Sequence, residues 1–435
     1  MMRFISLLLL LVFSGVAVSE ETTQSSDSTY ATPDFAKPVE HERYGSRGNF
    51  ATPLGKHTYL IPYPYYNQIT GATAGITAIA SGYLQPQVTA FANFIISDNG
   101  SKIGYFQLEN LQLFGRFFFD TKILYGEWGA VDVYIDRSNN SNEDDFVEIE
   151  ADDQWYRLGF EFLLPIGDGK DTIVDRYRIQ GSRVTPDTAS GGHGWSPLDS
   201  GRTYLRLEPF YRKEELDTLG TFVTSGLTTA IDYDNRDWPV NPGRGNRVYL
   251  EYKRDWGNLK DSVEWTAIQG SYSQYFPLGA SDWFEQQVLA FDLWSLYIPT
   301  WDDTEIIDGE PRNKRPPPFA GTSLGGWDRF RGYPANRFED KAGIDYQLEY
   351  RMVPRWNPFP KIPLIKRLDI PFWQLAVFGE LGRVAPEWSI DELHSDMRWN
   401  LGVGARAFVN GMLVRIDVAG SEEGAEVQMI VDQPF

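Results

Sequence analysis

Apolar and polar residues alternate along several segments of the chain, and this period of two constrains the fold more than any other feature. In "WYRLGFEFLLP" (residues 155–165), aromatic and aliphatic residues recur at every second position. The same period returns in "NRVYLEYK" (246–253), "IDYQLEYRM" (344–352) and "MLVRIDVA" (412–419). Successive side chains of a strand point to opposite faces, so each segment is expected to be a strand with one apolar and one polar face.

Two architectures produce this pattern, and the aromatic content favours one of them. Aromatic residues make up 15% of the chain, yet its formal net charge is −20 and its mean hydropathy is −0.37. A membrane barrel accommodates both properties, because alternate residues face lipid and a wet lumen. We therefore predict an all-β fold, a transmembrane antiparallel β-barrel of about 16 strands. A large secreted β-sandwich, whose polar face meets solvent, stays open as the alternative.

The length of the chain agrees with a barrel of this size. Roughly 16 strands of about 10 residues use about 160 positions of the region that begins at Tyr59. The remaining positions allow short turns at one end and long loops at the other. The best candidates for external loops are two polar segments, Asp136 to Gln154 and Ile298 to Pro318.

The N-terminal segment has the features of an export signal. In "MMRFISLLLLLVFSGVAVSEETT" an arginine precedes an apolar run, which ends in the small residues Ala17 and Ser19. This order predicts a signal peptide at residues 1–19, although an uncleaved anchor stays open as an alternative. Residues 20–56, rich in Ser, Thr, Glu and Pro, are expected to form a short disordered periplasmic lead. Residues 57–435 are expected to form the barrel domain.

Composition and spacing argue against several kinds of site. The chain has no cysteine, which excludes disulfides, a thiolate nucleophile and cysteine metal sites. Its charge is opposite to that of a nucleic-acid binder. The carboxylates Asp302, Asp303 and Glu305 lack the spacing of a calcium loop, and neither a phosphate-binding loop nor a dinucleotide fingerprint is found. We therefore expect no cofactor, no metal and no nucleic-acid partner.

Four motifs follow one another in the second half of the chain. They are "IDYDNRDWPVNPGRGNRVYLEY" (231–252), "FRGY" (330–333), "FGELG" (378–382) and "LGVGARAF" (401–408). In this order they resemble the bacterial surface antigen family, the BamA/TamA-type outer-membrane barrels. The first half of the chain resembles that family only in its alternation. The resemblance implies a long external loop that folds into the lumen.

The same resemblance implies roles for particular residues in the lumen. The tip of the loop would be a four-residue motif that is held by acids on the inner wall and supported by neighbouring strand motifs. An arginine buried in a narrow lumen is costly alone, whereas a two-pronged contact with a carboxylate satisfies it. A solvated arginine at the tip stays open as the alternative. The loop motif is Phe330, Arg331, Gly332 and Tyr333, the wall acids are Glu349 and Glu380, and the strand motifs contribute Phe378, Gly382, Gly402, Gly404 and Arg406.

The family usually has an aspartate where this chain has Glu380, so the geometry of the contact with Arg331 is expected to differ. A second expectation concerns the C-terminus, "EVQMIVDQPF", where alternate residues from Val427 to Phe435 would share one face of a last strand. A terminal aromatic on such a strand resembles the signal that barrel-assembly machinery recognises. Phe435 is therefore expected to be the C-terminal assembly signal, with Pro434 tolerated only at the end of the strand.

The expected function follows from what the chain resembles and from what it lacks. Residues 20–56 are too few for one periplasmic POTRA module, which needs about 57 residues. We expect a non-catalytic barrel in the outer membrane of a Gram-negative bacterium that assists the insertion or transport of protein or lipid. Its expected partners are outer-membrane lipid, the assembly machinery during biogenesis and an unidentified periplasmic or membrane protein.

Two other functions stay open. One is a structural or channel-forming barrel for small solutes. The other is an outer-membrane lipid hydrolase, which would need a serine paired with a histidine. His193 lies near Ser196 and Ser200, and His394 lies in another expected loop, but no G-x-S-x-G elbow accompanies either histidine.

Overall fold

The computed structural model describes residues 42–44, 57–67, 70–85, 87–307, 309–326, 329–363, 365–368, 370–409 and 412–435. The predicted signal peptide and most of the predicted lead therefore lie outside the described residues. None of the helices within these ranges has the length and apolar character needed to cross a membrane.

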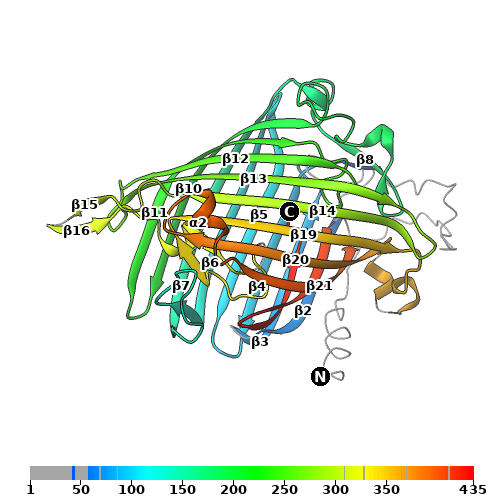
Figure 1. Ribbon diagram of the computed structural model, residues 1–435. Helices are drawn as coiled ribbons and strands as arrows, with labels where there is room; N and C mark the ends of the chain where they lie inside the picture. The colour runs from blue at the N-terminus through cyan, green and yellow to red at the C-terminus, as the bar shows by residue number, and fades with distance from the viewer. Residues whose placement is uncertain are drawn as a thin grey trace.

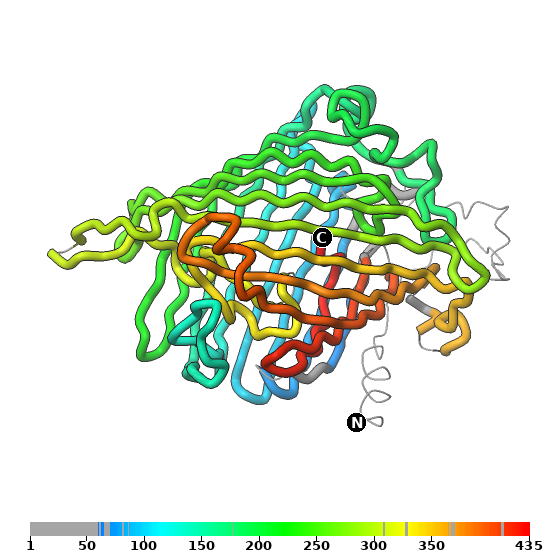
Figure 2. The backbone as a smooth tube through the Cα atoms, in the orientation of Figure 1, coloured from blue at the N-terminus to red at the C-terminus, as the bar shows by residue number. Residues whose placement is uncertain are grey.

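One antiparallel sheet of sixteen strands dominates the structure and curls into a barrel (Figures 1 and 2). Each strand pairs with its neighbour in the chain order, so the predicted fold class and strand number are confirmed. The strands are, in order, β2 (His57–Asn67), β3 (Gly71–Ser81), β4 (Thr89–Ser97), β5 (Lys102–Phe114), β6 (Phe117–Tyr134), β7 (Phe146–Leu163), β10 (Arg202–Leu216), β11 (Gly220–Asp234), β12 (Gly245–Trp256), β13 (Glu264–Gly279), β14 (Phe284–Tyr297), β19 (Ala342–Pro354), β20 (Trp373–Ala385), β21 (Arg398–Val409), β22 (Met412–Ser421) and β23 (Gly424–Val431).

The alternation of the sequence becomes the two faces of the wall. On β19, Leu348 is 49% exposed on the outer face, whereas its neighbour Glu349 is fully buried on the inner face. The polar segment 136–154, expected to be an external loop, is a loop only as far as residue 145, because β7 begins at Phe146. Strands β6 and β7 have 18 residues each and carry the ladder beyond their neighbours.

Residues 298–341, which we call the lumen loop, connect β14 to β19 at one end of the barrel, here called the loop end. The loop begins with a protruding hairpin, β15 (Thr304–Ile307) and β16 (Glu310–Asn313), seen at the left of Figure 1. After the 3₁₀ turn η3 (Pro318–Ala320), it forms a second hairpin, β17 (Thr322–Leu324) and β18 (Phe338–Asp340). Buried residues of this second part pack on Trp294 of the barrel wall, so the loop enters the lumen.

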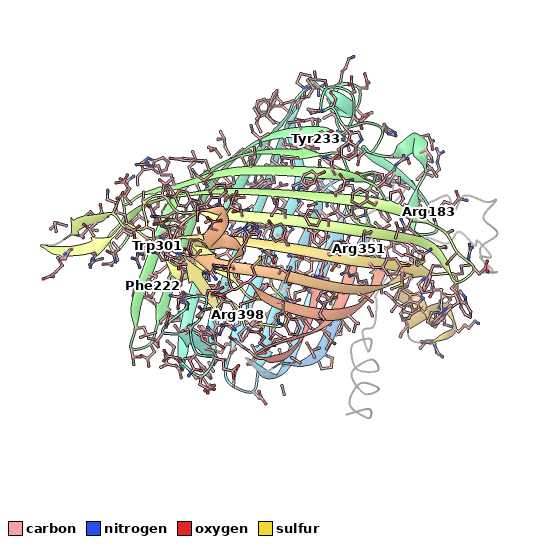
Figure 3. All side chains as sticks on the ribbon, viewed as in Figure 1. Arg183, Phe222, Tyr233, Trp301, Arg351 and Arg398 are labelled. Atoms are coloured by element: carbon pink, nitrogen blue, oxygen red, sulfur yellow. The ribbon has the colours of Figure 1, made fainter. Side chains whose placement is uncertain are left out.

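The opposite end of the barrel, where β2 begins and β23 ends, is called the terminal end. We expected short turns here, but three connections are long: residues 164–201, 235–244 and 355–372. The first contains η1 (Gly167–Lys170), β8 (Arg176–Gln180), β9 (Arg183–Val184) and η2 (Pro186–Thr188), and β8 pairs with β1 (Glu42–Tyr44) from the expected lead. Figure 3 shows Arg183 at this end and Trp301 at the loop end.

An apolar cluster at the terminal end of the lumen holds these connections against the barrel. Trp238 of the 235–244 connection packs edge-on against Phe372 and Phe408, with ring centroids 6.2 and 5.4 Å away. Tyr177 of β8 joins the same cluster. Buried aromatic pairs of this kind add to the stabilisation from burial alone, so the connections 164–201 and 235–244 cover the terminal mouth of the lumen.

The first and last strands of the sheet, β2 and β23, define a seam. Within the described parts of the chain, no ladder of backbone hydrogen bonds joins them. The last strand, β23, has 8 residues, fewer than any other strand of the barrel. The wall is thus continuous from β2 round to β23, and among the described residues no strand ladder closes it across the seam.

Candidate functional site

The tip of the lumen loop is held in a backbone conformation that suits close contact with the wall. Phe330 and Gly332 have positive φ angles of 59° and 86°. A Cβ at residue 332 would lie 3.1 Å from the Cβ of Ala419 on β22, and the carbonyl of Gly332 accepts a hydrogen bond from Ser421 at 2.7 Å. Only glycine adopts this conformation without strain, so Gly332 lets the tip lie directly on β22.

Two aromatic residues of the tip fix its position on the neighbouring strands. The rings of Phe330 and Tyr333 are stacked, with centroids 4.7 Å apart, and both side chains are fully buried. The Tyr333 hydroxyl donates to the carbonyl of Trp399 at 3.1 Å. A Cβ at Gly382 would lie 2.8 Å from the Phe330 ring. The glycine of the third motif therefore provides the space in which Phe330 packs.

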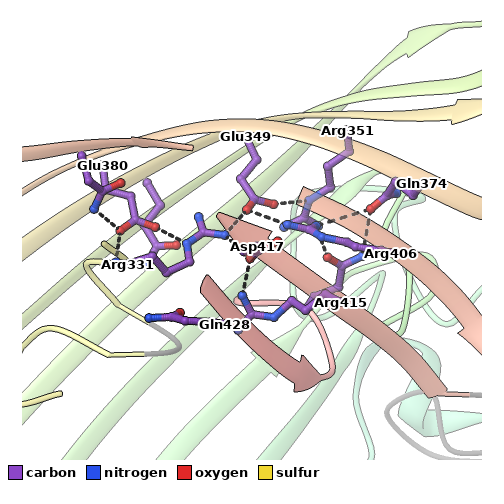
Figure 4. Close-up of polar contacts among 12 residues, drawn as sticks. Arg331, Glu349, Arg351, Gln374, Glu380, Arg406, Arg415, Asp417 and Gln428 are labelled. Carbon is purple, nitrogen blue, oxygen red and sulfur yellow. Dashed lines mark hydrogen bonds and ion pairs between the residues drawn. The ribbon is translucent and has the colours of Figure 1, made fainter. Parts of the chain in front are cut away.

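Arg331, which lies between these two residues in the sequence, makes ion pairs with three strands of the wall (Figure 4). Its Nε donates to Glu380 Oε1 at 2.5 Å, and its Nη1 donates to Glu349 Oε1 at 2.7 Å and to Asp417 Oδ2 at 2.9 Å. The guanidinium carbon lies 3.5 Å from the centroid of the Phe378 ring. Arg331 has no exposed surface, so the structure does not place it as a solvated residue.

The acids around Arg331 keep it charged despite its burial. Although desolvation lowers it, the pKa of Arg331 is raised above its usual value by Glu380, Glu349 and Asp417. Both acids expected from the sequence therefore contact the arginine, and Glu380 reaches it with the longer side chain in place of aspartate.

Further arginines extend this contact into a network. Arg351 and Arg406 both donate to Glu349, at 2.7 and 2.8 Å, and Arg415 donates to Asp417 at 2.6 Å. Glu380 is held differently: its other wall partner is the neutral amide of Asn400, at 2.7 Å. The network thus contains four arginines and three acids, and each acid except Glu380 has a second cation.

The strand glycines of the motifs make room for this network. A Cβ at Gly402 would lie 2.2 Å from the ring of Phe378, on which the Arg331 guanidinium packs. A Cβ at Gly404 would lie 2.2 Å from a carboxylate oxygen of Asp417. Steric space, more than backbone flexibility, is therefore the physical reason for glycine at both positions.

A second arginine of the lumen loop, Arg337, joins two other loops at the loop end. Its Nε and Nη2 bind both carboxylate oxygens of Glu423, in the turn between β22 and β23, at 2.8 and 2.9 Å. Its Nη1 donates to Ser141 Oγ at 2.8 Å, and its Nη2 to the Ser141 carbonyl at 2.9 Å, in the β6–β7 connection. Arg337 is fully buried and connects the β22–β23 hairpin to the β6–β7 connection.

Sequence reasoning missed several members of the network, namely Arg351, Asn400, Arg415 and Asp417 in the wall and Arg337 in the loop. Part of the signal was present, because Arg415 and Asp417 share the polar face of "MLVRIDVA". The alternation assigns these side chains to the lumen, but it does not say which strand the loop touches.

The C-terminus differs from the prediction. The last strand ends at Val431, and Asp432 has a φ of 93°, which turns the chain away from the strand. Phe435 lies inside the barrel with its ring stacked on Tyr275, centroids 6.1 Å apart, and 4.7 Å from the guanidinium carbon of Arg351. The expected common face with Val427 is therefore wrong for Phe435, because the turn at Asp432 breaks the alternation.

Ser200 and His394, two of the residues considered for hydrolysis, make hydrogen bonds to other groups. The Ser200 hydroxyl donates to Asn235 Oδ1 at 2.7 Å and accepts from the backbone N–H of His193 at 3.1 Å. The two ring nitrogens of His394 contact the Tyr346 hydroxyl and the Ile390 carbonyl, in and beside the short helix α2 (Ile390–His394). These contacts do not form the serine–histidine pair that nucleophilic hydrolysis requires.

Comparison with known proteins agrees with this architecture. The Omp85 superfamily domain matches residues 134–419, which is more than half of the chain. Among solved structures, CdiB from Acinetobacter baumannii is similar, with 10% sequence identity and a TM-score of 0.48; the match covers 90% of this chain and 60% of that chain. No curated protein matches the chain. The resemblance expected from the four motifs is thus confirmed by the domain match: the chain belongs to the Omp85 superfamily.

Proposed function

We propose that this protein is a non-catalytic barrel of the Gram-negative outer membrane that opens its wall at the seam to assist insertion or transport of protein or lipid. The observation that carries the proposal is the seam itself. The two end strands lack a ladder between them in the described residues, whereas every other neighbouring pair of the sheet has one. Breaking an existing ladder would cost many hydrogen bonds, so an unpaired boundary is where the wall opens most easily.

The sequence of β2 adds a reason for weak pairing. Pro62 and Pro64 lie in this strand, and proline has no backbone N–H to donate. Alternate residues of an antiparallel strand face the same neighbour, so both missing donors belong to one edge of β2. The ladder to β3 runs unbroken from His57 to Asn67, which assigns these positions to the seam edge.

The side chains that fill the lumen favour the hypothesis that the wall opens at the seam, and they argue against a permanent pore through the centre. Arg331 and its acids cross the interior near the loop end, and the Trp238 cluster covers the terminal mouth. A route through the centre would have to displace both, with their buried ion pairs and aromatic contacts. The channel for small solutes is the runner-up, and it predicts a different result in the following experiment.

The test compares the wild-type protein with Pro62→Val/Pro64→Val in liposomes. The double substitution restores two donors to the seam edge and favours the β conformation. We expect wild-type protein to accelerate the insertion of an unrelated unfolded barrel, and the double variant to accelerate it less. Pro209→Val, at a proline of β10 that pairs with Leu227 of β11 and lies away from the seam, is the matched control and should retain the wild-type rate.

Insertion at the same rate in empty liposomes and in liposomes with wild-type protein would contradict the proposal. Solute leakage without accelerated insertion would favour the channel. Equal acceleration of insertion by all three proteins would show that insertion does not depend on the pairing at the seam.

A further inference from the structure

The connection between β19 and β20, residues 355–372, folds back onto the outer face of the barrel at the terminal end. It is the gold segment at the lower right of Figure 1. Trp356 and Trp373 pack edge to face with centroids 4.8 Å apart, and the Trp373 ring N–H donates to the Trp356 carbonyl at 2.8 Å. Trp373 occupies the outward phase of β20, since its neighbour Gln374 is buried in the lumen network.

A second group of contacts shows where this segment lies along the wall. Ile365 and Ile370 form a cluster with Ala407 and Val409, the outward residues at the end of β21, and with Val414 of β22. Val409 is therefore only 5% exposed, whereas Val403, on the same face nearer the middle of β21, is 56% exposed. The segment thus replaces lipid over the terminal rim of β21 and β22, beside the last strand of the seam.

The charge of this segment is opposite to that of the chain. It contains Arg355, Lys361, Lys366 and Arg367 against the single acid Asp369, in a protein of net charge −20. Lys361 and Lys366 are exposed, and neither makes an ion pair with any residue that the structure describes. We call residues 355–372 the basic foot.

Exposed apolar side chains accompany these lysines. Trp356 is 57% exposed, and Ile362, adjacent to Lys361, is also exposed. Tryptophan is enriched where a membrane protein meets the headgroups, and lysine beside it keeps its charged end in that layer. Basic residues near a membrane surface are attracted by anionic lipids. Outward position, interfacial aromatics and unpaired lysines therefore occur together at one rim.

From these contacts we propose that the basic foot binds the headgroups of anionic phospholipids, of the phosphatidylglycerol class, in the leaflet at the terminal end. Lys361 and Lys366 attract the phosphate, while Trp356 and Ile362 enter the headgroup layer. The apolar cluster with β21 and β22 holds this lipid site beside the seam. The inference concerns lipid selectivity and goes beyond the proposed insertion activity, which it does not require.

Quenching of Trp356 by brominated lipids tests the proposal on the full-length protein in vesicles. The signal of Trp356 is the difference between wild type and Trp356→Phe, measured in phosphatidylcholine vesicles with either brominated phosphatidylglycerol or brominated phosphatidylcholine at equal mole fraction. We expect stronger quenching by phosphatidylglycerol. The preference should fall about fivefold for each of Lys361→Gln and Lys366→Gln, as expected for loss of one interfacial charge. Lys361→Arg/Lys366→Arg should retain it.

Lys260→Gln, at an exposed lysine of the loop end, is the matched control and should leave the preference unchanged. Equal quenching by both lipids in the wild-type protein would overturn the proposal. A preference that survives in Lys361→Gln/Lys366→Gln would do the same. Inorganic phosphate at constant ionic strength should not abolish the preference; if it does, the foot binds free phosphate and the lipid assignment is wrong.

Discussion

Both carboxylate oxygens of Glu380 accept hydrogen bonds from Arg331, one from its side chain and one from its backbone N–H. Oε1 accepts from Nε at 2.5 Å, and Oε2 accepts from the backbone N–H at 2.7 Å. The side-chain contact satisfies the buried charge, and the backbone contact fixes where along β20 the loop tip lies. Because Glu380 has no second arginine among the described residues, it depends on Arg331 more than Glu349 or Asp417 does.

Replacement of Arg331 by alanine should release the lumen loop without unfolding the barrel. Breaking a buried ion pair costs about 3–5 kcal/mol, and that cost falls on the loop contact, since the sixteen-stranded ladder does not include Arg331. We expect faster protease cleavage within residues 298–341 and a noisier single-channel conductance. Lysine at 331 should rescue only partly, because it lacks the planar fork. Arg312→Ala, in the protruding hairpin of the same loop, should behave as wild type.

A double-mutant cycle isolates the contact between Arg331 and Glu380. Glu380→Gln should resemble Arg331→Ala, and the combined variant should lose less than the sum of the two, because both changes remove one interaction. Protease cleavage of the loop provides the measurement. Strict additivity would show that the two residues do not contact each other in the membrane.

Gly402→Ala should destabilise the barrel, although alanine adopts the backbone conformation of a strand as readily as glycine does. The added methyl group would lie 2.2 Å from the Phe378 ring, so the ring that carries Arg331 must move. Overpacking of this kind costs about 1–3 kcal/mol. The measurement is the temperature at which the folded band is lost on unheated gels. The control is Gly420→Ala, whose Cβ would have no contact nearer than 3.9 Å, and a similar loss there would contradict the steric explanation.

The stability of the lumen loop should depend on pH through Glu339. Burial raises the pKa of this residue to about 7, although the Arg137 guanidinium, 2.8 Å away, opposes the shift. A carboxyl whose folded pKa lies above its usual 4.5 binds its proton more tightly when folded. Its contribution is therefore complete below pH 4.5 and is lost as the pH rises towards about 7.

We accordingly expect slower cleavage of the loop at about pH 5 than at about pH 8, and a weaker pH dependence in Glu339→Gln. An unchanged pH dependence in Glu339→Gln would assign the effect to another group.

Removal of Phe435 should lower the amount of assembled barrel without altering export, if the terminal aromatic is recognised during assembly. The structure adds a second role to be separated from this one, because the ring packs on Tyr275 in the finished barrel. Tyr275→Ala removes that contact and leaves the C-terminus intact. Heat-modifiable band intensity in purified outer membranes measures both variants. Equal losses in the two would mean that internal packing explains the effect; unchanged assembly without Phe435 would show that it carries no signal.

The period of two, together with the aromatic content and the chain length, was enough to predict the barrel and its strand number, and the family resemblance pointed to Glu349 and Glu380 as acids of the inner wall. The period of two could not predict that Asp417 also contacts Arg331, because alternation gives the face of a residue but not the path of a loop through the lumen. The turn at Asp432 was missed for a related reason: a single positive φ at a non-glycine residue leaves no trace in the alternation. Long connections at the terminal end were missed because Trp238 and its partners come from distant segments of the chain.

Arg337 of the lumen loop links the β6–β7 connection to the β22–β23 turn. Because it is bonded to Glu423 on one side and Ser141 on the other, a movement of β22 and β23 pulls directly on the β6–β7 connection. The coupling is reciprocal, as any linkage between two equilibria must be. A ligand that restrains the β6–β7 connection at the loop end should therefore also restrain the β22–β23 turn, and a change of pairing at the seam should alter the loop-end surface.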